Sequence, residues 1–110
     1  MIQGDVCLHT FKFPDKRRPV LILTRNSAIS DLTWITVAPV TTTLRNISTE
    51  VWLDESDGMF EECAVNLDNI QTVQKEKLGK VIAHLSSEKL REVLDAVNFA
   101  FDFNRLEVER

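Results

Sequence analysis

Residues 16–24 form the stretch that most constrains what this chain can fold into. Three cations stand directly before a proline, and the proline opens an unbroken apolar run over residues 20–23. The run is too short for a helix and rich in branched residues, so it predicts a buried strand. Pro19 has a fixed φ and no N–H, which suits the first residue of a strand and keeps Arg18 extended. The cations are then held at the mouth of a rigid element, although spacing alone fits a solvated loop flank equally well.

The distribution of charge indicates where an anion would bind. The net charge of -4 argues against a general polyanion binder. Up to Thr49 the chain has six Lys/Arg against three Asp/Glu, and from Glu50 onward it has seven against fourteen. We therefore expect any contact with an anion in the first half of the chain.

Length and composition predict one soluble domain. The chain has 110 residues, enough for one core but not two. No apolar run approaches the roughly 18 residues of a membrane span, and Met1 leads into polar residues without a signal-peptide core. We expect a cytoplasmic protein that makes no membrane contact. Cys7 and Cys63 are too few and too far apart for a disulfide framework or a zinc site, so they are expected to be buried free thiols.

Periodicity predicts a mainly β chain with one helix at its end. Strands are expected over residues 5–10, 20–23, 34–40, 49–53, 63–67, 70–73 and 81–84. Residues 26–31 read as a turn, Gly58 is expected at positive φ, and His84 is expected to pack or cap without a partner near it in sequence. Ser86 is a predicted N-cap, and the helix after it carries an apolar stripe of Leu90, Val93, Leu94, Val97 and Phe101.

Hydroxyl side chains follow the predicted third strand, where Pro39 is expected to interrupt the ladder. Thr41, Thr42 and Thr43 are either ordinary β-forming residues or ligands placed at a strand exit. The sequence has no glycine-rich phosphate loop, paired-cysteine zinc pattern or nucleophile elbow. If the protein handles phosphates, arginine and hydroxyl side chains must therefore hold them.

Several segments together resemble the MazF/PemK family, the toxins of type II toxin-antitoxin systems that cut single-stranded RNA. They follow the family's order over nearly the whole chain, from about residue 4 to residue 101. The segments are Gly-Asp-Val at 4–6, Arg-Pro-Val-Leu-Ile-Leu at 18–23, Val-Ala-Pro-Val-Thr-Thr-Thr at 37–43, Val-Asn-Leu-Asp-Asn-Ile-Gln-Thr-Val at 65–73, Leu-Gly-Lys at 78–80 and Leu-Ser at 85–86.

The resemblance implies a strongly curved, SH3-like small β-barrel with a C-terminal α-helix. It also implies a homodimer, a cognate antitoxin partner and sequence-specific cleavage of mRNA that inhibits translation and growth. The family's catalytic arginine and threonine correspond to Arg18 and Thr41, and Asp68 matches an aspartate implicated in RNA handling in some members.

Further RNA contacts are expected beside the two catalytic positions, at Lys16, Arg17, Thr42 and Thr43. The chain departs from the family pattern just before the arginine. Asp-Lys-Arg stands at 15–17, where many members have a pair of glycines.

The chemistry of RNA agrees with this resemblance. The ribose 2′-hydroxyl is an internal nucleophile, so an enzyme that aligns it with the adjacent phosphorus needs no metal or cofactor. Arg18 can donate two parallel hydrogen bonds to the charge that gathers on the phosphate, and Thr41 would hold the same group. The products would be a 2′,3′-cyclic phosphate and a 5′-hydroxyl. The base remains open between His9, Asp68 and a lysine of the loop before Arg18.

Two other functions fit parts of the sequence. A gyrase poison of the CcdB type shares the fold but is not an enzyme, and the Arg18 and Thr41 pair argues against it. A non-catalytic SH3-like or OB-like RNA-binding module would need exposed stacking aromatics, for which Phe11, Phe13 and Trp52 are candidates.

The homodimer is also expected from the apolar pattern. The strand at 20–23 is apolar on both faces, and the terminal helix adds a stripe of its own.

Overall fold

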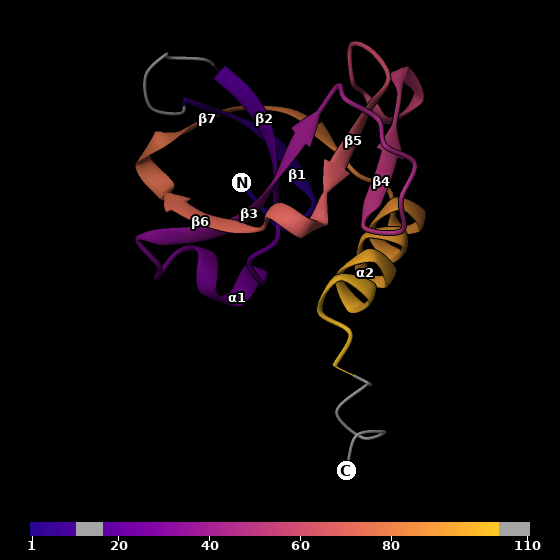
Figure 1. The fold of residues 1–110 in the computed structure, drawn as a ribbon. Coiled ribbons are helices and arrows are strands. Elements are labelled where there is room, and N and C mark those ends of the chain that lie inside the picture. Colours follow the sequence, from indigo (N-terminus) through magenta and orange to yellow (C-terminus); the bar gives the residue numbers. More distant parts are fainter. Residues whose placement is uncertain (11–16, 104–110) are drawn as a thin grey trace.

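The sheet is the body of the molecule, and its strands curl around one another into a small barrel (Figure 1). The computed structural model describes residues 1–10 and 17–103, and within them all seven strands pair antiparallel in the order β4-β5-β3-β2-β1-β7, with β6 also on β3. The strands are β1 Asp5–Thr10, β2 Arg17–Ile22, β3 Trp34–Thr41, β4 Glu50–Leu53, β5 Cys63–Asn66, β6 Gln71–Gln74 and β7 Leu78–His84. The helices are α1 Asn26–Ile29, α2 Ser87–Phe101 and the 3₁₀ turns η1 Glu55–Asp57, η2 Leu67–Asn69 and η3 Lys75–Lys77. The predicted mainly β, SH3-like barrel with a C-terminal helix is confirmed.

Strand β3 connects the parts of the barrel. One edge pairs with β2, while the other pairs first with β6, from Trp34 to Val37, and then with β5, at Val40 and Thr41. Pro39 lies between these two ladders, at the place where β3 exchanges one neighbour for the other. The sequence predicted that Pro39 would interrupt the strand. Instead, β3 changes its neighbour from β6 to β5 there and continues to Thr41.

The apolar second half of β2, residues 20–22, is buried on both faces by this chain alone. Val20 and Ile22 pack inside the barrel with Cys7, and Leu21 packs into a second core that α2 covers. All three β2 side chains have 0% exposure. Leu23, which follows β2, is only partly buried and lines an apolar groove along α2, so apolar surface for a second subunit remains at this end of the run.

The start of β2 also differs from the prediction. The strand begins at Arg17, so Pro19 is its third residue. Its ladder with β3 begins only at Val20, so the missing N–H of Pro19 falls before that ladder.

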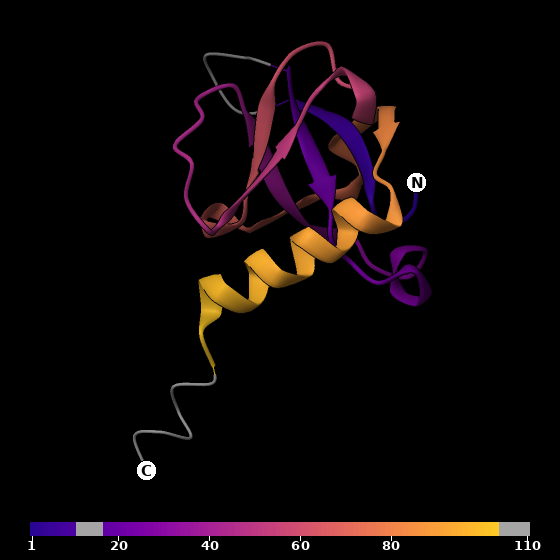
Figure 2. The ribbon, with the colours of Figure 1, turned by 90° about the vertical axis from the view of Figure 1, so that its right-hand side faces the viewer.

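Helix α2 begins as predicted and packs beside β4 (Figure 2). The Ser86 hydroxyl accepts a hydrogen bond of 3.2 Å from the Lys89 amide, while Val93 and Ala96 face the core. Leu94 remains 54% exposed. No helix in the described part of the chain is long and apolar enough to cross a membrane.

Two local predictions are corrected by contacts between distant parts of the sequence. Residues 26–29 form a helical turn, α1, and the Lys75 ammonium group donates hydrogen bonds to its last carbonyls, at Ile29 and Ser30. His84 does have a partner, because the β1–β7 register sets Asp5 opposite it and their side chains meet at 2.8 Å. Gly58 has the predicted positive φ, 95°, and both cysteines are buried free thiols as predicted.

Candidate active site

Strand pairing places His9 opposite Arg18 and brings the end of β3, with Thr41, close to the start of β2. His9 is directly opposite Arg18 in the β1–β2 ladder. The β2–β3 ladder begins at Val20 and Pro39, shortly after Arg18 and shortly before Thr41, and both of these residues line one hollow. Opposed residues of an antiparallel pair project to the same face. The two predicted catalytic residues, 23 positions apart in sequence, are therefore neighbours.

Arg18 and Thr41 line a polar hollow of about 240 Å³, which we call the Arg18 hollow. Its walls come from β2, the end of β3, the segment after β3, and the turn between β5 and β6. The lining residues are Arg18, Pro39, Val40, Thr41, Thr43, Arg45, Asn66 and Asn69. Cationic, hydroxyl and amide groups gathered in one hollow provide hydrogen-bond donors for an anion.

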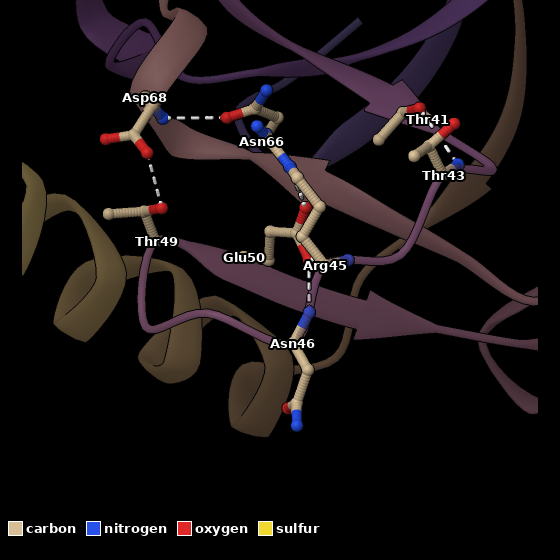
Figure 3. A network of polar contacts seen from close by, with 8 residues as sticks. All are labelled: Thr41, Thr43, Arg45, Asn46, Thr49, Glu50, Asn66 and Asp68. Atoms are coloured by element: carbon tan, nitrogen blue, oxygen red, sulfur yellow. Dashed lines mark hydrogen bonds and ion pairs between the residues drawn. The ribbon is translucent and has the colours of Figure 1, made fainter.

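The segment after β3 orients the Thr41 hydroxyl. The Thr43 amide donates a hydrogen bond of 3.1 Å to the Thr41 oxygen (Figure 3). Because this bond occupies a lone pair of the oxygen, the hydroxyl hydrogen remains available to donate to a ligand. Thr43 thus contributes to the site through its main chain as well as by lining the hollow.

A second hollow, which we call the Arg17 hollow, lies beside the first and shares Thr41 with it. Its volume is about 270 Å³, and Arg17 and Thr42 line it together with the apolar side chains of Leu8, Pro19, Val40, Met59, Phe60, Cys63 and Ile82 and the carboxylate of Glu61. Phe60 is 88% exposed, so its ring is available for stacking. Burial and nearby acidic groups raise the pKa of Cys63 to about 11, which keeps this thiol protonated and unreactive.

Asp68 lies apart from the Arg18–Thr41 pair. Its carboxylate accepts a hydrogen bond of 2.6 Å from the Thr49 hydroxyl, and its amide donates to the Asn66 side chain (Figure 3). Asp68 does not line the Arg18 hollow, whereas Asn66 and Asn69 on either side of it do. The structure thus separates this candidate from the other predicted site residues.

His9 is adjacent to Arg18 in the sheet but is buried, with 6% exposure. Burial, with a smaller effect from the charge of Lys77, lowers the pKa of His9. The imidazole is therefore neutral near pH 7, the form that can accept a proton.

Some residues predicted from the sequence lie outside the part of the chain that the structure describes. One candidate site residue was not predicted. Lys16, Phe11 and Phe13 lie outside the described residues. Arg45 was not predicted as a site residue, yet it lines the Arg18 hollow. Its signal in the sequence is weak, since it is one of the six cations of the first half.

Metal ligands do not gather in the described ranges. In residues 1–10 and 17–103, no three His, Cys, Asp or Glu side chains are grouped as a metal ion would require.

Known proteins resemble this chain over most of its length. Residues 2–101 match the family model described as PemK-like, MazF-like toxin of type II toxin-antitoxin system. The endoribonuclease MazF3 of Mycobacterium tuberculosis is 42% identical over 90 residues, which cover 82% of this chain and 87% of that protein. The probable endoribonuclease MazF5 of the same organism is 38% identical over 81% of this chain and 83% of that protein.

Solved structures give the same result. The M. tuberculosis toxin MazF-mt6 superposes with a TM-score of 0.78 at 40% identity, covering 87% of this chain and 96% of that one. A mycobacterial endoribonuclease in complex with its cognate antitoxin superposes with a TM-score of 0.84 at 25% identity, covering 94% and 96% of the two chains.

Proposed function

Because this chain belongs to the PemK-like, MazF-like toxin family of type II toxin-antitoxin systems, we propose that it is an endoribonuclease that cuts single-stranded RNA through the ribose 2′-hydroxyl. Its curated relatives are named endoribonucleases. Cleavage of mRNA in this way inhibits translation and growth. The observation that carries the mechanism is the shared hollow of Arg18 and Thr41, built from neighbouring strands.

The reaction is an internal transfer at phosphorus. The 2′-oxygen forms a bond to the adjacent phosphorus as its proton passes to a base, and the bond from phosphorus to the 5′-oxygen breaks as that oxygen takes up a proton. The products are a 2′,3′-cyclic phosphate and a 5′-hydroxyl. Alignment of a nucleophile already attached to the substrate supplies a large part of the rate enhancement.

Arg18 and Thr41 act on the phosphate oxygens. The Arg18 guanidinium stays charged at any working pH and can donate two parallel hydrogen bonds to the non-bridging oxygens. The Thr41 hydroxyl, whose oxygen already accepts from Thr43, donates to the same phosphate. Both interactions strengthen as negative charge gathers in the transition state.

The other assigned side chains contact RNA around this phosphate. Arg17, with Thr42 in the neighbouring hollow, and Lys16 contact the RNA backbone, and Thr43 supports the substrate at the lip of the Arg18 hollow. Asp68, held by Thr49, is a more distant contact. Exposed Phe60 offers a stacking surface for a base beside Arg17.

The partners are a cognate antitoxin and a second copy of the chain, in the cytoplasm where mRNA is translated. A type II toxin is held inactive by its antitoxin, and acidic side chains of that partner would compete with RNA phosphates near Arg17. The second copy would cover the apolar groove of about 520 Å³ along α2, where Leu94 and Phe101 are each 54% exposed. Contiguous exposed apolar surface of this kind is typical of an interface.

The rival functions are less well supported. A gyrase poison of the CcdB type does not account for the match to endoribonucleases or for the Arg18 hollow. A non-catalytic RNA-binding module is consistent with the exposed aromatics Trp52 and Phe60, but these also suit an enzyme that binds RNA.

The test is cleavage of one single-stranded RNA and its matched analogue. Purified protein should cut the RNA in excess EDTA and should fail on the same strand with one 2′-deoxyribose at the cut position. Cleavage of the deoxy analogue would require a water nucleophile, and loss of cleavage in EDTA would require a metal. Either result would overturn the mechanism. Inhibition of DNA gyrase without RNA cleavage would support the gyrase poison.

A further inference from the structure

A buried carboxylate organises the loop that follows β3. Glu50 is the first residue of β4, and its side chain has 0% exposure. One of its oxygens accepts hydrogen bonds from the amides of Arg45 and Asn46, at 3.0 and 3.2 Å, and the other accepts from Arg45 Nε at 3.2 Å (Figure 3). All three donors come from one turn, in which Asn46 has a positive φ of 54°.

A carboxylate in this position is costly unless its oxygens are bonded. Removing an ionised group from water is strongly unfavourable without hydrogen bonds or a counter-charge. Glu50 has both, since it accepts two main-chain amides and faces a guanidinium. These hydrogen bonds to the Glu50 carboxylate hold the backbone of the turn in place and orient the Arg45 side chain.

Arg45 uses only one edge of its guanidinium for this purpose. A guanidinium has five N–H donors, and Glu50 engages the one on Nε. The side chain is 49% exposed and lines the same hollow as Arg18 and Thr41. The remaining donors are therefore available to an anion in the hollow.

Two arginines in one hollow offer donors for two neighbouring phosphates of a nucleic-acid backbone. Arg18 lies on β2 and lines the hollow together with Thr41, whereas Arg45 lies on the segment that follows Thr41. The Glu50 carboxylate partly neutralises Arg45, which suits a cation that holds a phosphate in the ground state better than one that meets new charge in the transition state.

We propose that Arg45 binds the phosphate next to the one that is cut and that Glu50 is the positioning residue that orients it. This inference rests on the proposed endoribonuclease function. Arg45 then acts in substrate binding, and Glu50 acts on RNA only through Arg45.

The experiment compares Arg45→Ala, Arg45→Lys, Glu50→Gln and the double variant with Arg91→Ala. Arg91 is an exposed arginine on α2, outside both hollows, and serves as the matched control. Binding is measured with a single-stranded oligonucleotide that carries 2′-deoxyribose at the cut position, over a range of salt concentrations. Cleavage of the corresponding RNA gives kcat and KM, and circular dichroism verifies the fold of each variant.

Arg45→Ala should weaken binding about tenfold, as expected for one lost charge-assisted hydrogen bond, and should lower the salt slope by about 0.7, the value for one phosphate contact on a single strand. KM should rise with little change in kcat. Arg45→Lys should recover part of the affinity, because it restores the charge but not the contact with Glu50.

The double variant separates positioning from a general structural role. If Glu50 acts through Arg45, then Glu50→Gln should weaken binding in the wild type but add almost nothing once Arg45 is alanine. Additive losses would overturn the positioning role. The Arg45 side chain is half exposed, so its substitutions should leave the fold intact. The Arg45 variants therefore still test the proposal if Glu50→Gln does not fold.

Two results would overturn the assignment of Arg45. One is an Arg45→Ala variant that matches Arg91→Ala in affinity and salt slope. The other is a loss confined to kcat, which would place Arg45 on the transition state. A wild-type protein that binds the oligonucleotide but cuts no RNA would instead contradict the proposed function, and the binding measurements would still decide the role of Arg45.

Discussion

His9 and Arg18 occupy directly opposed positions in the β1–β2 ladder, yet one is buried and the other is exposed. Arg18 lines a polar hollow, while His9 is buried in β1 between β2 and β7. The base candidate nearest to Arg18 in the sheet is therefore a buried, neutral imidazole in the opposed position of β1.

The first prediction concerns Arg18 and Thr41. If both act mainly on the transition state, Arg18→Ala and Thr41→Ala should each lower kcat by roughly two to four orders of magnitude, the range for lost electrostatic stabilisers. RNA binding should change less than cleavage, because the deoxy analogue lacks the charge that develops during reaction. Single-turnover cleavage and equilibrium binding give the two values.

Arg17→Ala is the control for these variants. A cation that contacts only backbone phosphate should weaken binding and reduce its salt dependence while leaving the chemical step nearly unchanged. Equal losses of kcat at positions 17 and 18 would mean that the distinction between the two arginines is wrong.

The second prediction uses the lowered pKa of His9. The folded protein keeps His9 neutral to a lower pH than the unfolded chain does, because burial disfavours the charged imidazole. Its stabilising contribution is present above about pH 6.5, the unfolded value, and is lost as the pH falls through the lower, folded value. Urea unfolding at pH 8, 6.5 and 5 should show decreasing stability, and His9→Gln should show a smaller decrease over the same range.

The same variant tests His9 as the base. If His9 takes the 2′-proton, His9→Gln should lower kcat by roughly two to four orders of magnitude and remove the acid limb of the pH–rate profile. An unchanged kcat and profile would leave Asp68 and the loop lysines as the candidates. Asp68→Asn then provides the next comparison, since it keeps an acceptor for the Thr49 hydroxyl.

The third prediction concerns the subunit contact. Light scattering at micromolar concentration should give about twice the chain mass of 12.6 kDa. Leu94→Lys and Phe101→Glu should shift the protein towards the monomer, because each places a charge on the exposed apolar side of α2. Arg91→Glu, an exposed position of α2 that does not line the groove, serves as the surface control. A monomeric wild type, or no response to either α2 substitution, would contradict this interface.

The fourth prediction is competition between RNA and the antitoxin. Acidic antitoxin side chains should occupy the cationic region near Arg17, so antitoxin binding should weaken at high salt and in Arg17→Ala. Titration of a preformed toxin–antitoxin complex with the deoxy oligonucleotide should release the antitoxin. A ternary complex in which neither ligand lowers the affinity of the other would show that the two sites are separate.

The predicted fold follows from local patterns that the structure preserves. The apolar run at 20–23 is a central buried strand, and the hydroxyls after Pro39 lie beside the arginine before Pro19 because β2 and β3 are antiparallel neighbours. The α2 cap at Ser86 also follows from local chemistry. The strand and the cap depend on short-range rules, so the sequence is enough to predict them, whereas the closeness of Arg18 and Thr41 was expected only from the family resemblance.

The missed features depend on contacts between distant residues. Glu50 alternates with Val51 as an outward-facing residue would, yet its carboxylate is buried because the turn at Arg45 folds back onto it. The pairing of Asp5 with His84 requires the β1–β7 register. The alternation of apolar and polar residues shows which side chains of a strand share a face. It does not show whether a distant segment of the chain folds over that face and buries it.

Strand β3 is bonded along both edges, to β2 on one side and to β6 and then β5 on the other. Its amides can exchange with solvent only when several ladders open together, so we expect them to be among the slowest in the protein. Thr41 is the last residue of this strand. The hydroxyl that we propose to be catalytic therefore lies at the end of a strand bonded along both edges, so we expect local fraying in other elements to displace it little.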